Sequence, residues 1–299
     1  GDEVGVVQHF LGSVDKLQAH EGPRGKHGVR GRVDEFLARG RQRHCARDVA
    51  REDVLRLVPI RPGDADLLTL KARRLLHEAD VVVHDRLVDA SILELARREA
   101  RIVAVGKVAY GPSWSQTDIN ALLVREAAAG QVVVRLKGGD ASIFGRLDEE
   151  TAALDAAGLD WTVVPGVTAA SAAAAAAGRS LTRRGRNAGL RLLSAHDAEG
   201  FADQDWRALA RPGSVAAVYM GVAASAFLRG RLLMHGAAPE TPVTLVENAG
   251  RTGARVVGAT LVDLPERLDA LGPTGPVLLL YGIAPRAAAQ TLTTSRKAL

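Results

Sequence analysis

The sequence predicts an α/β protein with two α/β domains, and three observations support this. From Val54 onward, short runs of β-branched and aliphatic residues alternate with longer amphipathic stretches, a pattern typical of strands and helices that follow one another along the chain. After about Pro165, strand-like runs become more frequent. The chain has 299 residues, 47% of them hydrophobic, which is enough to build two ordinary cores.

Periodicity predicts seven elements in the first half of this region. The expected strands cover residues 54–60, 80–85, 101–107 and 131–139, and the expected helices cover residues 67–79, 90–100 and 116–130. Gly130 closes the third helix, and either Asp64 or Asp66 is expected to cap the first. Because strands and helices alternate, a parallel sheet covered by helices is expected.

The second half is predicted to hold more strands. These cover residues 190–195, 214–221, 241–249, 254–261 and 275–283, with a helix over 225–236. The alanine-rich run 170–178 precedes them, so we place the junction between the domains near residues 165–178. The expected organisation is an N-terminal extension over 1–53 and domains over 54–165 and 166–299. A cleft between two domains is the default position for a ligand.

The extension differs in composition from the rest of the chain. It is rich in Arg, Gly and His and shows little apolar periodicity, so we expect weak order or short helices. Its histidines have no spacing that places two of them on one helical face with a carboxylate, and no metal site is predicted. They are His9, His20, His27 and His44. The single cysteine, Cys45, leaves no partner for an internal disulfide.

The formal net charge of +5 favours an anionic partner, either nucleic acid or a small polycarboxylate or phosphate. Only 4% of the residues are aromatic, and no basic segment is interleaved with aromatic side chains, which disfavours nucleic acid. No apolar run approaches twenty residues, and the first residues lack the order of a signal peptide. We therefore expect a cytoplasmic protein with no membrane partner.

The segment VVRLKGGDASIFGR, residues 133–146, contains the strongest local signal for a site. A strand that ends in Gly138-Gly139-Asp140 leaves the chain at the carboxyl edge of the sheet, where open α/β sheets bind ligands. Glycines there let a ligand approach the backbone. Asp140 could bind a ribose hydroxyl or cap a following helix. The loop after the first strand matches neither dinucleotide-binding nor triphosphate-binding glycine motifs.

Several further segments occur in a characteristic order along the chain. They are PGDADLLTLKA, ADVVVHDRLV, VGK, SQTDINALLVREA, VVRLKGGD, IFGR, VVPGVTAASAAAA, YMG and PVTLVEN. Over about residues 54–285 the chain thereby resembles the tetrapyrrole methylase family, in particular its uroporphyrinogen-III C-methyltransferases and the methyltransferase part of siroheme synthases. Each segment is a weak signal alone, but their shared order is specific.

The resemblance implies a fold and an activity. It implies two α/β domains with S-adenosylmethionine bound in the cleft between them, usually in a homodimer. It also implies transfer of two methyl groups to ring carbons of uroporphyrinogen III, which gives precorrin-2 by way of precorrin-1, with S-adenosylhomocysteine as the second product. This reaction belongs to siroheme and cobalamin biosynthesis. A basic cleft would suit the substrate's eight carboxylates.

The resemblance also assigns roles to residues. Asp85 matches a proton acceptor, Lys107 a proton donor, and Arg146 faces the substrate's carboxylates. The donor-binding positions are Pro62, Gly138, Gly139, Asp140, Ile143, Thr168, Ala169, Met220 and Ala249. Judged from the residues alone, other roles are open. Asp85 could be a loop cap paired with Arg86, Lys107 a surface lysine, Met220 a flexible core residue and Thr168 a helix cap.

Departures from the family pattern keep two alternative functions open. Pro59 and Arg61 stand where the family has glycines, and Val108 stands where it has an arginine. These changes motivate a paralogue that binds tetrapyrrole or S-adenosylmethionine without turnover. The basic charge and the Arg-rich N-terminal segment motivate a methylase of the same fold that acts on RNA or protein.

Overall fold

The computed structural model describes residues 55–60, 65–85, 88–106, 114–251 and 253–286. The predicted N-terminal extension, with its histidines and Cys45, lies outside the described residues. Pro62 and Lys107 also lie outside them, so neither of these two predicted site residues is placed.

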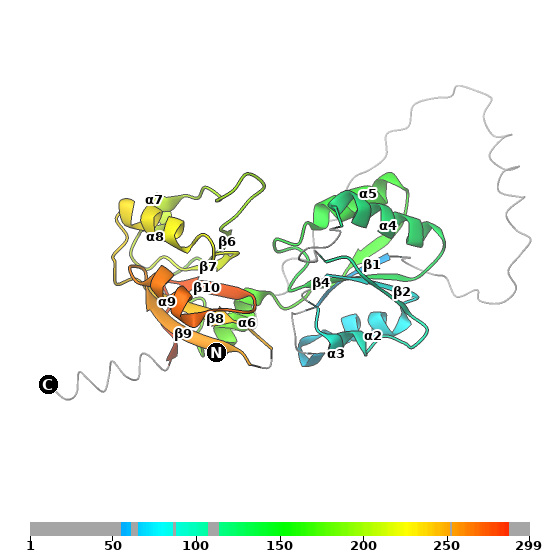
Figure 1. Ribbon diagram of the computed structural model, residues 1–299, viewed down its shortest axis with the longest axis horizontal. Helices are drawn as coiled ribbons and strands as arrows, with labels where there is room; N and C mark the ends of the chain where they lie inside the picture. The colour runs from blue at the N-terminus through cyan, green and yellow to red at the C-terminus, as the bar shows by residue number, and fades with distance from the viewer. Residues whose placement is uncertain (1–54, 61–64, 86–87, 107–113, 252, 287–299) are drawn as a thin grey trace, which may run out of the picture. The chain divides into compact units, whose positions relative to one another are not determined.

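The first sheet has five parallel strands in the order β3-β2-β4-β1-β5. Figure 1 labels β1, β2 and β4 among them. The strands are β1 (Leu55–Ile60), β2 (Val81–His84), β3 (Arg101–Ala104), β4 (Val133–Gly138) and β5 (Trp161–Val163). All five come from the predicted first domain, and four of them were predicted as strands; β5 was not. Strand β4 is central because β1 and β2 pair with its two edges. The predicted parallel sheet is confirmed.

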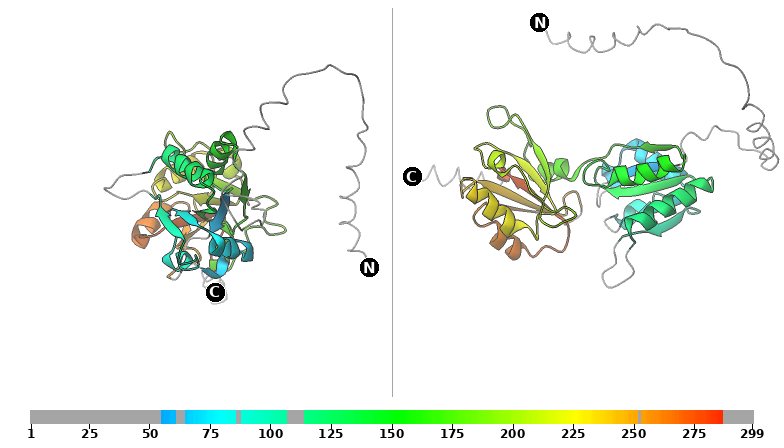
Figure 2. Two further views of the ribbon diagram at one scale, coloured as in Figure 1. Left: turned by 90° about the vertical axis from the view of Figure 1, so that its right-hand side faces the viewer. Right: turned by 90° about the horizontal axis from the view of Figure 1, so that it is seen from above.

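Helices cover both faces of this sheet, as its β-branched strands require. On one face, α2 (Leu70–Glu78) and α3 (Ala90–Leu93) pack Leu76 and Ile92 against Val134 and Leu136 of β4. On the other face, α4 (Gln116–Ala128) and α5 (Leu147–Ala156) lie side by side (Figures 1 and 2). Their leucines pack against Val133.

The helix ends follow local capping rules, with one surprise. Ser115 and Asp118 form a capping box at the start of α4, and Gly130 lies past its end with φ of +77°. Helix α2 is capped by Thr69, whose Oγ1 accepts a hydrogen bond from the Ala72 N–H at 3.1 Å. The prediction that Asp66 caps this helix was wrong, because Asp66 lies inside the preceding 3₁₀ turn (Ala65–Leu67); Asp64, the other predicted cap, lies outside the described residues.

The helix predicted over 90–100 is much shorter. Helix α3 ends at Leu93, and the chain continues in turns toward β3. Arg97 explains this early end, because its Nε donates to the Ala79 carbonyl at 2.8 Å and its guanidinium pairs with Asp80. A tertiary contact thus overrides helical propensity. Helix α5 was not predicted, although three acidic residues in its first turn are a helix-start signal.

The second sheet has the order β6-β7-β10-β8-β9, with only β6 and β7 parallel. Its strands are β6 (Arg191–Ser194), β7 (Ala216–Tyr219), β8 (Pro242–Glu247), β9 (Arg255–Thr260) and β10 (Val277–Tyr281). Each lies within a predicted strand. Helix α6 (Ala169–Ala176) packs its alanines against one face. Since alanine is small, the helix can approach the strands closely.

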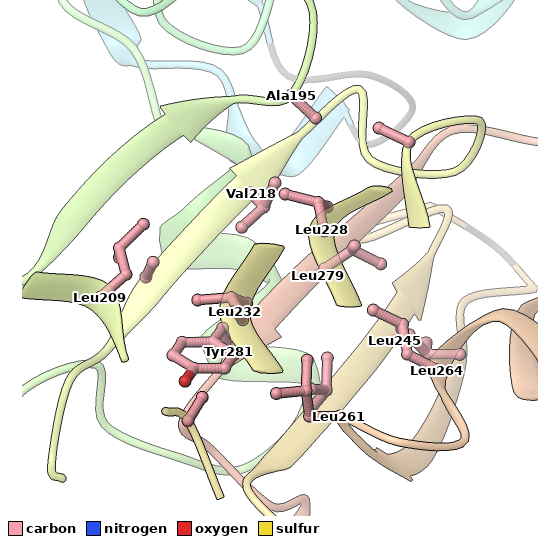
Figure 3. Packing of buried hydrophobic residues seen from close by; sticks show 14 of the residues in the cluster. Ala195, Leu209, Val218, Leu228, Leu232, Leu245, Leu261, Leu264, Leu279 and Tyr281 are labelled. Atoms are coloured by element: carbon pink, nitrogen blue, oxygen red, sulfur yellow. The ribbon is translucent and has the colours of Figure 1, made fainter. Parts of the chain in front are cut away.

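The other face of this sheet carries α7 (Trp206–Leu209), α8 (Ser225–Met234) and α9 (Leu264–Leu271). Figure 3 shows Leu228 and Leu232 of α8 near Val218, Leu279 and Tyr281 of the strands, in one hydrophobic core. A void of about 20 Å³ in this core is lined only by hydrophobic residues and Tyr281. That volume is about the size of one water molecule, so the void is a packing feature.

Candidate functional site

The turn after β4 is built around Asp140. Gly139 has φ of +88°, which glycine adopts without strain. Asp140 Oδ1 accepts a hydrogen bond from the Ser142 N–H at 2.9 Å, and Oδ2 accepts one from the Gly166 N–H at 2.8 Å. No helix begins at Asp140, since α5 starts only at Leu147, so the helix-cap interpretation was wrong. Asp140 instead ties the turn to the segment before α6.

These hydrogen bonds decide the charge of Asp140. Partial burial alone would raise the pKa of its carboxyl group, but the hydrogen bonds from Ser142 and Gly166 outweigh it and hold the pKa below its usual value. The site therefore contains an ionised carboxylate at neutral pH.

A cavity of about 260 Å³ opens beside this turn. That is close to the lower end of the range for small organic ligands, about 300–1,000 Å³. Every predicted donor-binding residue within the described part of the chain lines it: Gly138, Gly139, Asp140, Ile143, Thr168, Ala169, Met220 and Ala249. The remaining lining residues were not predicted: Phe144, Tyr219, Val246, Pro276, Val277 and Leu278. We refer to this cavity as the Gly138–Met220 pocket.

Tyr219 organises one wall of this pocket from the end of β7. Its hydroxyl lies 2.5 Å from Thr168 Oγ1 and accepts a hydrogen bond from the Ala170 N–H at 3.2 Å. Its ring centroid lies 5.0 Å from that of Phe144. Thr168 occupies the N-cap position of α6, but its side chain makes no capping hydrogen bond. The available signal for Tyr219 was its place before Met220 in YMG.

Unusual backbone conformations concentrate around the pocket. Within the described residues, four non-glycine residues have positive φ: Phe144, Arg146, Met220 and Asn248. Phe144 and Met220 line the pocket. Arg146 lies two residues after Phe144, and Asn248 directly precedes Ala249, another lining residue. Such conformations cost about 1–3 kcal/mol each and cluster at functional sites. Met220 is 52% exposed, so the interpretation as a core residue was wrong. Its carbonyl lies 3.1 Å from His196 Nδ1.

Glu247 holds in place the segment that precedes β10. Its buried Oε1 accepts hydrogen bonds from the Thr274 and Gly275 N–H groups at 2.8 and 2.9 Å. Burial raises the pKa of this carboxyl group, but these bonds and Arg255 lower it below its usual value. The loop before β10 is further tied by the Asn248 N–H, which donates to the Pro276 carbonyl at 2.9 Å. This fixes Pro276 and Val277 at the pocket.

Asp85 follows β2 at the same edge of the sheet as the turn after β4, because His84 pairs with Leu136 in register. Its Oδ1 accepts a hydrogen bond from Arg135 Nη2 at 2.6 Å, and its side chain is 34% exposed. Asp85 does not line the Gly138–Met220 pocket. Arg86, its alternative partner in the sequence, lies outside the described residues.

Arg146 is also separate from the pocket lining. It forms two hydrogen bonds with Glu149, from Nε at 2.7 Å and from Nη2 at 2.6 Å, and its side chain is 57% exposed. The bonds to Glu149 raise the pKa of its guanidinium. A substrate contact by Arg146 stays a prediction.

Among the residues that the structure describes, no group of three or more His, Cys, Asp or Glu side chains could hold a metal ion. The same residues include no helix that is both long and apolar enough to span a membrane. The lining of the Gly138–Met220 pocket offers a ligand the carboxylate of Asp140, the hydroxyl-bearing side chains of Thr168 and Tyr219, glycine backbone and apolar side chains.

Comparison with known proteins shows which family the chain belongs to. Residues 54–265 match the family described as Tetrapyrrole (Corrin/Porphyrin) Methylases. The chain belongs to this family. The predicted α/β, tetrapyrrole methylase-like fold is confirmed by solved methylase structures, and the structure shows it as two sheets.

The chain is similar in sequence to two siroheme synthases and in structure to two solved methyltransferases. It is 46% identical over 226 residues to siroheme synthase 3 of Aeromonas hydrophila and 46% identical over 227 residues to siroheme synthase of Methylococcus capsulatus. Each alignment covers 76% of the chain and 48% of the relative, so the chain spans about half their length.

The first structure is uroporphyrin-III C-methyl transferase from Thermus thermophilus complexed with S-adenyl homocysteine. It is 39% identical with a TM-score of 0.64, and the match covers 76% of this chain and 91% of that one. The second, a cobalt precorrin-4 methyltransferase, is 26% identical with a TM-score of 0.68 and coverages of 76% and 94%. The chain thus shares its fold with both of these methyltransferases.

The charge of Asp140 predicts a pH dependence of stability. Asp140→Asn is expected to lower the free energy of unfolding by about 1 kcal/mol at pH 7, because it weakens charge-assisted hydrogen bonds. Since the folded-state pKa is depressed, this contribution is fully present above pH 3.8 and is lost as the pH falls through the folded-state pKa. Urea denaturation between pH 7 and pH 3 measures it.

Asp197→Asn is the matched control, because Asp197 also accepts backbone hydrogen bonds, from Glu199 and Gly200, but only within its own turn. If the difference in the free energy of unfolding between wild type and Asp140→Asn grew on acidification, Asp140 would not be an ionised, hydrogen-bonded carboxylate.

Proposed function

We propose that this chain catalyses S-adenosylmethionine-dependent C-methylation of uroporphyrinogen III at two ring carbons, giving precorrin-2 by way of precorrin-1 in siroheme or cobalamin biosynthesis. The observation that carries the proposal is the convergence of the predicted donor-binding residues on one pocket. The identity of 46% to siroheme synthases supports the same reaction.

The residues of the Gly138–Met220 pocket fit the donor. The ionised carboxylate of Asp140 has about four acceptor positions, and hydrogen bonds from Ser142 and Gly166 leave one for a ribose hydroxyl. Val246, Leu278 and Phe144, which all line the pocket, offer apolar surface to an adenine ring. When bound, the donor supplies an activated sulfonium methyl group. The chain has to hold and align it, and no covalent nucleophile is needed.

The proposed roles outside the pocket concern protons and carboxylates. Reduced pyrrole carbons are electron-rich, so the protein must align the reacting atoms and then accept a proton. We assign proton acceptance to Asp85, which lies at the same sheet edge as the turn after β4, and proton donation to Lys107. Arg146 and the net charge of +5 would serve the substrate's carboxylates.

The proposal includes an architecture and an assembly. Strands of the first sheet fall within residues 55–163 and those of the second within 191–281, which supports domains over 54–165 and 166–299. The family resemblance supports a homodimer that binds the tetrapyrrole as a small-molecule substrate. Residues 1–53 are proposed as a separate extension.

The direct test is an anaerobic incubation with enzymatically generated uroporphyrinogen III and S-adenosylmethionine. The expected product is heavier by two methyl groups and gives a sirohydrochlorin absorbance spectrum after oxidation. Binding of S-adenosylhomocysteine without any product would contradict turnover and support a binding paralogue. Methylated RNA or protein in a parallel incubation, with the tetrapyrrole unchanged, would contradict the proposed substrate.

A second test concerns the donor site alone. Tyr219→Phe removes the hydroxyl that holds Thr168 and the start of α6, so it is expected to raise the Kd for S-adenosylhomocysteine about 5–10-fold. Isothermal titration calorimetry measures this. Tyr281→Phe on β10 is the control, since Tyr281 is buried and lies outside the pocket lining. Equal effects of the two substitutions would show that the pocket is not the donor site.

A further inference from the structure

A buried cluster of charged side chains lies under α4 and α5. Along β4, side chains alternate between faces, so Val133, Arg135 and Lys137 point to the same side. Val133 belongs to the hydrophobic core on that side. The side chains of Arg135 and Lys137 are only 3% and 4% exposed, so the core face ends in two buried cations near the carboxyl edge.

Glu150 of α5 anchors both cations. Its side chain is fully buried, and its Oε1 accepts hydrogen bonds from Lys137 Nζ at 2.8 Å and from Arg135 Nε at 3.2 Å. Gln116 Nε2 of α4 donates to the same oxygen at 3.2 Å. Glu150 Oε2 has no hydrogen-bond partner in the described part of the chain. One anion therefore faces two cations, and a second negative charge is required for balance.

Asp85 supplies that second charge. A different nitrogen of the same guanidinium, Nη2, donates to Asp85 Oδ1 at 2.6 Å, and Nη1 donates to the Leu136 carbonyl at 3.0 Å. Arg135 is thus held by Glu150 and by backbone while it holds one oxygen of Asp85. The other oxygen, Oδ2, accepts no hydrogen bond from the residues that the structure describes.

Stability is a weak explanation for this arrangement. Apolar side chains of similar volume usually replace a buried ion pair without loss of stability. The pKa of Lys137 shows that burial is unfavourable, because desolvation lowers it and nearby Arg135 lowers it further, against the opposing effects of Glu150 and Asp85. The cluster is better explained by the half-exposed carboxylate that it orients at the edge of the sheet.

We propose that Arg135, anchored on Glu150, is a positioning residue that fixes Asp85 Oδ1 and leaves Oδ2 to take the proton released on methylation. The inference rests on the proposed function. A ring carbon forms a bond to the methyl carbon while the methyl–sulfur bond breaks with its electron pair on sulfur. The ring is then a cation, and a proton leaves it for Asp85 Oδ2, which restores a neutral ring and a neutral carboxyl group.

A double-mutant cycle on kcat tests this coupling. Arg135→Gln is expected to lower kcat at least about tenfold, with the Kd for S-adenosylhomocysteine within about twofold of wild type. Asp85→Asn is expected to lower kcat further, and the double variant should match Asp85→Asn alone within about threefold, because Arg135 acts through Asp85. Arg135→Lys keeps the charge but loses the fork, so partial activity is expected.

Arg56→Gln is the control, since Arg56 lies on adjacent β1 and pairs with Glu78 at 2.8 Å outside the cluster. Its kcat should equal that of wild type. If Arg135→Gln does not fold, Arg135→Lys takes its place in the double-mutant cycle with Asp85→Asn. If the losses in kcat from Arg135→Gln and Asp85→Asn multiplied in the double variant while the wild type was active, the positioning role of Arg135 would be overturned, and the proposed function would stand. Absence of product from a wild type that binds S-adenosylhomocysteine would overturn the proposed function and the inference with it.

Discussion

The carboxyl end of β4 is the constraint on which the rest of the site depends. This strand is central in its sheet, so both edges are paired and both faces are covered. Its last residues must still place the charged side chains of Arg135 and Lys137 on one face, and a glycine turn must follow the strand. Glu150 makes the first possible by compensating Arg135 and Lys137. Gly139 makes the second possible by adopting positive φ.

From that strand end, the pocket is assembled by side-chain hydrogen bonds between segments that are distant in sequence. Asp140 reaches the Gly166 N–H, Tyr219 reaches Thr168 and the Ala170 N–H, and Glu247 reaches the loop before β10. Each tie satisfies polar groups that are at least partly buried and also holds a wall of the cavity. In a pocket built in this way, the side chains of Asp140, Tyr219 and Glu247 hold the walls in place, which suits a ligand bound mainly through backbone groups and apolar contacts.

The sequence predicted the strands of both sheets except the short β5, because their alternating apolar pattern is local. It also predicted the pocket lining where family motifs mark it. It did not predict the early end of α3, since the Arg97–Asp80 contact is tertiary. Nor did it predict the Arg135–Glu150 cluster, because charged residues on a strand pattern normally indicate an exposed face. Positive φ at Phe144 and Met220 has no local signal, since neither residue favours it.

The central claim is that the strand end places a donor pocket and an oriented carboxylate at one edge of the first sheet. A crystal structure with bound S-adenosylhomocysteine tests it most directly. The account predicts the ligand in the Gly138–Met220 pocket, with a ribose hydroxyl on Asp140 and with Arg135 still bonded to Asp85. A ligand bound outside this pocket, or Asp85 turned away from Arg135, would contradict the account.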